Sequence, residues 1–135
     1  MISHLDHLVI TTGDEDACVD FYTRVLGMSL QTFMAGKPPG ARKSLHFGPQ
    51  KINIHVAGAE FDPKAHRPTV GSQDLCFMLA VPLDAMIDHL NKEQWPIMLG
   101  PVPRTGATGM IRSVYVRDPD QNLIELCEAT PQTPQ

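Results

Sequence analysis

Leu5-Asp6-His7-Leu8-Val9-Ile10 is the stretch that decides the fold, because it begins a strand pattern that occurs twice along the chain. Lys51-Ile52-Asn53-Ile54-His55-Val56 ends the first occurrence of this pattern. Gln73-Asp74-Leu75-Cys76-Phe77 begins the second occurrence, and Asn122-Leu123-Ile124-Glu125-Leu126 ends it. The repetition predicts a duplicated unit folded about a pseudo-twofold axis.

Each of these four strands carries one imidazole or carboxylate that such an axis would bring to one place: His7, His55, Asp74 and Glu125. Two imidazoles and two carboxylates suit a divalent metal ion of borderline-to-hard character. Side-chain alternation supports this placement, since Ile52 and Ile54 share one face of their strand while His55 lies on the other. We therefore expect a metal site in which Asp74 either binds the ion as the fourth ligand or accepts a hydrogen bond from one of the other ligands.

The composition is that of an ordinary globular protein, because 42% of the residues are apolar and 19% are charged. A chain of 135 residues is long enough for one domain with its own core. Its net charge of −4 disfavours nucleic acid as a partner. Three cysteines without a paired spacing, no signal-like start and no long apolar run predict a cytoplasmic protein that does not enter a membrane.

The whole chain, 1–135, is expected to form this single domain from two modules. We place module one at about residues 2–58, a polar linker at about 59–71, module two at about 72–129, and a frayed tail at 130–135. The elements expected in module one are a strand at 5–12, a helix between Asp14 and Gly27, and strands at 28–34, 44–47 and 51–56. Those expected in module two are a strand at 74–80, a helix after Pro82, a short strand near 97–98, a loop at 100–109, and strands at 110–116 and 122–127.

Four segments of the chain resemble the vicinal oxygen chelate superfamily, which includes glyoxalases, bleomycin-resistance proteins and extradiol dioxygenases. They are Asp6-His7-Leu8-Val9-Ile10, Phe21-Tyr22 with Leu26-Gly27-Met28, the loop at 100–107, and Arg117-Asp118-Pro119-Asp120 with Asn122-Leu123-Ile124-Glu125. Other segments, such as Gly71-Ser72 followed by Asp74-Leu75-Cys76, look closest to glyoxalase-domain-containing protein 5 and its bacterial relatives.

The resemblance implies an α+β fold in which two βαβββ modules form a curved eight-stranded sheet around a metal cleft, often in a homodimer. It also implies ligands at the positions of His7, His55, Asp74 and Glu125. The sequence departs from the family pattern at Asp74, where histidine is usual, and at His55, where glutamate or glutamine is frequent. At Gln121 the Asp-Pro-Asp turn normally continues with glycine, so we expect a positive φ there.

The chemistry that this resemblance implies is glyoxalase-like. One divalent ion, of Ni, Co, Zn, Mn or Fe, would chelate adjacent oxygens of a small substrate and stabilise an enediolate-type oxyanion. Glu125 is our first choice for the base that moves the proton, with Asp74 second. Arg104 is a candidate clamp for an anionic substrate group.

Two other functions stay open. His7, His55 and Glu125 are also the residue types of an extradiol-type dioxygenase acting on a catechol-like substrate. A metal-free protein that binds a small molecule or an antibiotic is the non-enzymatic alternative. It is disfavoured because two carboxylates would share a cleft without a cation. Two other histidines are weaker candidates for the site. His46 could contact a metal ligand without touching the ion, and His66 in the linker could cover the cleft. His4 and His89 are expected to be exposed.

Overall fold

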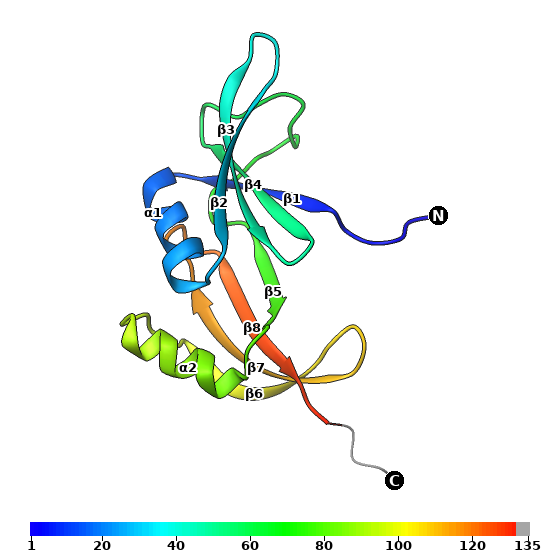
Figure 1. Ribbon diagram of the computed structural model, residues 1–135, viewed down its shortest axis with the longest axis vertical. Helices are drawn as coiled ribbons and strands as arrows, with labels where there is room; N and C mark the ends of the chain where they lie inside the picture. The colour runs from blue at the N-terminus through cyan, green and yellow to red at the C-terminus, as the bar shows by residue number, and fades with distance from the viewer. Residues whose placement is uncertain (132–135) are drawn as a thin grey trace. The chain divides into compact units, whose positions relative to one another are not determined.

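The computed structural model describes residues 1–131. The chain forms two compact units, Met1–Gln73 and Asp74–Gln135. Each unit has the element order strand, helix, strand, strand, strand (Figure 1), so the expected α+β fold of two βαβββ modules is confirmed. The last four residues of the expected frayed tail, 132–135, lie outside the described residues.

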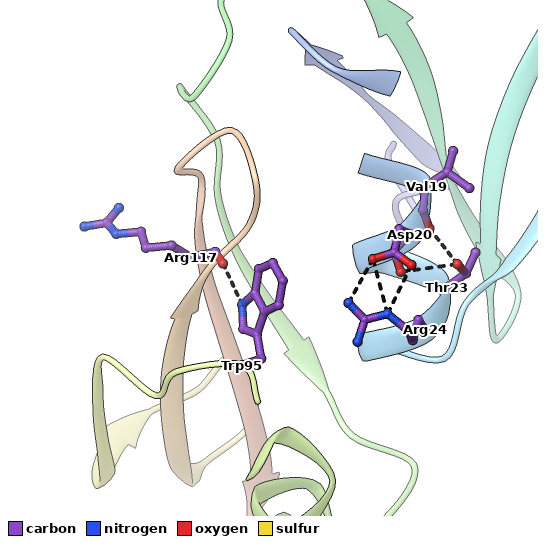
Figure 2. Close-up of polar contacts among 6 residues, drawn as sticks. All are labelled: Val19, Asp20, Thr23, Arg24, Trp95 and Arg117. Carbon is purple, nitrogen blue, oxygen red and sulfur yellow. Dashed lines mark hydrogen bonds and ion pairs between the residues drawn. The ribbon is translucent and has the colours of Figure 1, made fainter. Parts of the chain in front are cut away.

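In the first unit a helix follows the first strand and three strands come after it. The elements are β1 (His7–Thr12), α1 (Glu15–Asp20), the π-helical turn η1 (Phe21–Val25), β2 (Ser29–Ala35), β3 (Gly40–Phe47) and β4 (Gln50–Val56). Asp14 begins the helix as predicted, because its Oδ1 accepts a hydrogen bond from the Ala17 amide at 3.1 Å. Arg24 pairs with Asp20 at 2.9 Å, one helical turn earlier (Figure 2).

The sheet of the first unit has the strand order β1-β4-β3-β2, with β1 and β4 parallel and the other pairs antiparallel. Its core consists of apolar side chains at most 8% exposed: Ile10, Cys18, Phe21, Tyr22, Val25, Met28, Leu45, Ile52 and Ile54. The predicted alternation in β4 is confirmed for Ile52 and Ile54, which are buried.

The second unit repeats this plan. Its elements are β5 (Asp74–Met78), α2 (Leu83–Lys92), β6 (Leu99–Thr105), β7 (Met110–Arg117) and β8 (Leu123–Ala129), and the strand order is β5-β8-β7-β6. Glu128 on β8 accepts a hydrogen bond from the Leu83 amide at 2.9 Å, which satisfies a donor at the start of α2. The eight expected strands are therefore present as two four-stranded sheets.

The segment 100–109, which the sequence led us to expect as a loop, is mostly strand β6. It lies at the edge of its sheet, where prolines are tolerated because one row of backbone N–H groups has no partner strand. The pairing with β7 shifts between Leu99 and Val102, and Gly100 at this irregularity has a φ of 108°. The loop prediction was wrong because glycine and proline were taken as the end of a strand.

A tight turn joins β7 to β8. Asp118 is buried, and its carboxylate accepts hydrogen bonds from the backbone amides of Asp120 and Asn122, both at 2.9 Å. Gln121 has a φ of 71°, which confirms the predicted positive value. Trp95 fixes the segment after α2, because its Nε1 donates to the Arg117 carbonyl at 2.9 Å (Figure 2).

Among residues 1–131, no helix combines the length and the apolar character that crossing a membrane requires.

Candidate functional site

His7 lies at the first position of β1 and is exposed. Its Nδ1 and the neighbouring Asp6 Oδ1 are 2.8 Å apart, and its side chain is 43% exposed. This contact lowers the pKa of the Asp6 carboxyl. In the parallel pairing of β1 with β4, His7 stands opposite Lys51.

His55 lies towards the other end of the same strand pair, opposite Thr11. It is therefore four residues beyond the partner of His7, which corresponds to about 13 Å at roughly 3.3 Å per residue. Side chains on one face of a sheet project in parallel, so this separation persists at the ring nitrogens. The structure does not bring His7 and His55 together, because strand parity places them on one face while the register holds them apart.

The environment of His55 is apolar and positively charged. The residue is 7% exposed, and its ring meets the edge of Phe61 with the two centroids 5.5 Å apart. The guanidinium of Arg42 lies over the same Phe61 ring at 4.1 Å. Burial is the main cause that lowers the pKa of His55, and the Arg42 charge adds to it. His55 is thus a neutral imidazole near neutral pH.

This lowered pKa predicts a pH dependence of stability. The folded state binds a proton on His55 less readily than the unfolded state does. The contribution of His55 to the free energy of unfolding is therefore fully present above about pH 6.5 and is lost as the pH falls through the folded-state pKa. The carboxyls of Asp20 and Glu60, with lowered pKa values, titrate at more acidic pH.

Urea unfolding of the wild type and His55→Gln at about pH 7.5 and about pH 5.5 measures this effect. We expect the wild type to lose more stability on acidification than the variant. Equal losses in the two proteins would mean that His55 protonates as easily in the folded chain as in the unfolded one.

A pocket of about 430 Å³ opens above His55 within the first unit. Val9 and Thr11 of β1 and His55 of β4 lie along one side. The other side comes from the segment that follows β4, including Pro63, Lys64, Ala65, Arg67 and Pro68. This segment was predicted only as a linker, and its role as a pocket wall was missed because it has no periodicity.

In the second unit Glu125 lies on β8, on the face opposite to that of the buried Ile124 and Leu126. The Ser113 hydroxyl on β7 donates a hydrogen bond to Glu125 Oε2 at 2.6 Å. Tyr115 is the cross-strand partner of Glu125 on β7, and Cys76 is its partner on β5. A half-buried carboxylate is thereby fixed in position.

Arg104 is connected to Glu125 through Tyr115, whereas Asp74 is related to it only by strand register. Arg104 Nε donates to the Tyr115 hydroxyl at 3.0 Å, so the predicted anion clamp is oriented by the partner of Glu125. Asp74 pairs with Leu123, two residues before Glu125 on the same face of the sheet, and it is exposed. Ser113 and Tyr115 escaped sequence reasoning because only the β7–β8 register identifies them.

A family model described as the Glyoxalase/Bleomycin resistance protein/Dioxygenase superfamily matches residues 4–126. The chain belongs to this superfamily. Virulence protein STM3117 of Salmonella typhimurium is 48% identical over 128 residues, which cover 95% of this chain and 85% of that protein. Glyoxalase domain-containing protein RDO1 of Mycosarcoma maydis is 54% identical over 125 residues, covering 93% and 68%.

Two solved structures of superfamily relatives match almost the whole chain. The crystal structure of STM3117 has a TM-score of 0.90 and 47% identity, and the match covers 96% of this chain and 99% of that one. An integron cassette protein from the mobile metagenome of V. cholerae has a TM-score of 0.89 and 49% identity, with 96% and 98% covered. The resemblance found in the sequence is confirmed.

Superfamily members are often metal-dependent, so the fit of these residues to a metal ion matters. Within the described part of the chain, no three His, Cys, Asp or Glu side chains are placed to hold an ion. The register of β1 and β4 gives the physical reason in the first unit, since it places His7 and His55 four residues apart along the strand pair. The weaker candidates do not change this: His46 contacts Ser44 Oγ at 2.8 Å, His66 is exposed, and His89 lies on α2.

Two thiols lie beside Glu125 in the second unit. Cys76 Sγ and Cys127 Sγ are 3.6 Å apart, and both cysteines are free. Burial, together with a hydrogen bond to Cys127 and the charge of Glu125, raises the pKa of the Cys76 thiol to about 12. Cys76 is therefore protonated at neutral pH, which makes it a poor nucleophile: the residue as a whole is exposed, but its thiol faces Cys127 and the Glu125 carboxylate.

Proposed function

We propose that the chain is a glyoxalase-type enzyme that moves a proton between neighbouring carbons of a small substrate with adjacent oxygens, as a lyase or an isomerase. Glu125 acts as the base in this proposal. The observation that carries it is the hydrogen bond of 2.6 Å from Ser113 to Glu125 Oε2. This bond orients the carboxylate, as proton transfer requires.

The groups beside Glu125 suit the charge that such a reaction develops. Removal of a proton next to a carbonyl group leaves an oxyanion, which hydrogen-bond donors fixed in advance stabilise. Tyr115 stands opposite Glu125, and Arg104 is bonded to the Tyr115 hydroxyl and adds a positive charge. Asp74, two residues away in register, is the second candidate for the base.

The divalent metal ion and the homodimer remain predictions. Because the described side chains do not form a metal site, we assign no step to an ion. Metal analysis after purification without a histidine tag tests the first prediction, and content well below one equivalent after reconstitution would contradict it. Light scattering tests the second, and a monomer at micromolar concentration would contradict it.

The extradiol-type alternative has weaker geometric support than proton transfer. It needs His7, His55 and a carboxylate on the same ion, whereas the β1–β4 register separates the two imidazoles. The non-enzymatic alternative, binding of a small molecule, has one specific observation in its favour. That observation is the pocket of about 430 Å³ above His55, whose size lies in the range of ligand sites.

Anaerobic incubation with the hemithioacetal of methylglyoxal and a thiol tests the proposed function. We expect turnover, or exchange of the substrate's carbon-bound hydrogen with solvent deuterium, after reconstitution with each of the five candidate metals in turn. Oxygen uptake with catechols in the presence of ferrous iron would favour the dioxygenase. Neither turnover nor exchange under any of these conditions, together with tight binding of small molecules, would favour the binding protein.

A further inference from the structure

The floor of the pocket in the first unit is made of two polar residues that face each other across the β1–β4 pair. Thr11 is 6% exposed and His55 is 7% exposed, and both line the pocket. Within residues 1–131, neither the Thr11 hydroxyl nor the His55 ring nitrogens have a hydrogen-bond partner. Both groups line the pocket, so a ligand there can supply the hydrogen-bond partners that the protein does not.

The rim of the pocket carries two permanent positive charges. Lys64 and Arg67 both line it, and no carboxylate does. Lys64 has only a loose ion pair with Asp62, at 4.0 Å, and the Asp62 side chain is 86% exposed. Arg67 has no ion pair in the described part of the chain. Both cations are therefore available to an anion.

Two further charged residues, Arg42 and Glu60, act on His55. Arg42 is close enough to His55 to act on it electrostatically, and its Nε is buried without a hydrogen-bond partner. Glu60 is the one carboxylate that acts on His55, and its Oε1 already accepts a hydrogen bond from the Gly58 amide at 3.0 Å. Arg42 and Glu60 offset each other, so the net charge around the pocket remains that of Lys64 and Arg67, which is positive.

From this arrangement we propose that the pocket binds the oxyanion group, carboxylate or phosphate, of a small organic molecule. Lys64 and Arg67 neutralise the charge, and the Thr11 hydroxyl and a His55 ring N–H donate to its oxygens. Val9, Pro63 and Pro68 supply an apolar wall for the rest of the molecule. A volume of about 430 Å³ fits a metabolite of modest size better than a nucleotide or a peptide.

This site lies wholly in the first unit, and its existence does not depend on proton transfer at Glu125. The Glu125→Gln substitution is therefore expected to leave binding of an anion to this pocket unchanged. Loss of activity with intact anion binding would contradict the proposed function alone. Activity without anion binding would contradict the pocket inference alone.

Titration with inorganic phosphate and, separately, with pyruvate tests the inference at constant ionic strength set with chloride. The readouts are the dissociation constant from calorimetry and the His55 ring signals in the NMR spectrum. We expect at least one of the two probes to bind at millimolar concentration and to shift the His55 signals. Which probe binds more tightly distinguishes a phosphate ligand from a carboxylate ligand.

Arg67→Gln and Lys64→Gln remove one charge each from exposed positions and are not expected to disturb the fold. Each should weaken binding by about tenfold, since each removes a charge-assisted contact. Lys92→Gln at the end of α2 makes the same change of charge outside the pocket and should leave the dissociation constant within about twofold. The inference is overturned if neither probe shifts the His55 signals, or if the Arg67 and Lys64 variants bind like the wild type.

Discussion

Gly100→Ala is expected to destabilise the protein by about 3–4 kcal/mol, which combines backbone strain with overpacking. Gly100 has a φ of 108°, a conformation that alanine adopts only with strain. A Cβ atom at this position would lie 2.5 Å from the Ser113 carbonyl oxygen and 3.1 Å from the Val114 Cα. Both contacts are with the backbone of β7, in the middle of the second sheet, so neither can move aside cheaply. Thermal unfolding should shift down by roughly 10 °C.

Gly58→Ala is the matched control for this substitution. Gly58 also has a positive φ, of 82°, but no atom lies within 4 Å of a Cβ built there. Its cost should be limited to the backbone strain of about 1–2 kcal/mol. If Gly100→Ala costs no more than Gly58→Ala, then β6 does not approach β7 as closely as the structure places it.

The repeated strand pattern was sufficient to predict the two modules, and in the closing strands β4 and β8 the alternation of apolar and polar positions also predicted which face is buried. Ile52 and Ile54 are buried, and Glu125 lies on the face opposite Ile124, as alternation predicts. Alternation has a period of two, however, and it carries no information on which residues of two strands stand opposite each other. The prediction therefore placed His55 on the correct face while the register moved it about 13 Å from His7.

The pocket and the edge strand were beyond sequence reasoning for a different physical reason. The segment from Pro63 to Pro68 has neither helical nor strand periodicity, so nothing in its pattern indicates that it covers His55. In β6, prolines at 101 and 103 read as loop residues because a central strand would lose hydrogen bonds there. Only the position of β6 at the sheet edge makes these prolines acceptable.

Glu125→Gln should lower kcat by about a thousandfold, the middle of the range for loss of a general base, with little change in KM. The amide keeps the size of the carboxylate and still accepts a hydrogen bond from Ser113, but it has no useful basicity. The fold should therefore survive, which thermal unfolding can verify. Ser113→Ala, which leaves the base in place but removes the bond that orients it, should cause a smaller loss of kcat.

Glu128→Gln is the control on the same strand. Glu128 points from the opposite face of β8, where it accepts from the Leu83 amide and pairs with Arg112 at 3.4 Å. Glutamine can keep the first of these contacts, and an ion pair this exposed is worth at most about 1 kcal/mol. Its kcat should stay near that of the wild type. If Glu125→Gln and Glu128→Gln have equal activity, Glu125 is not the base, and Asp74, which faces the same side of the sheet, becomes the next residue to replace.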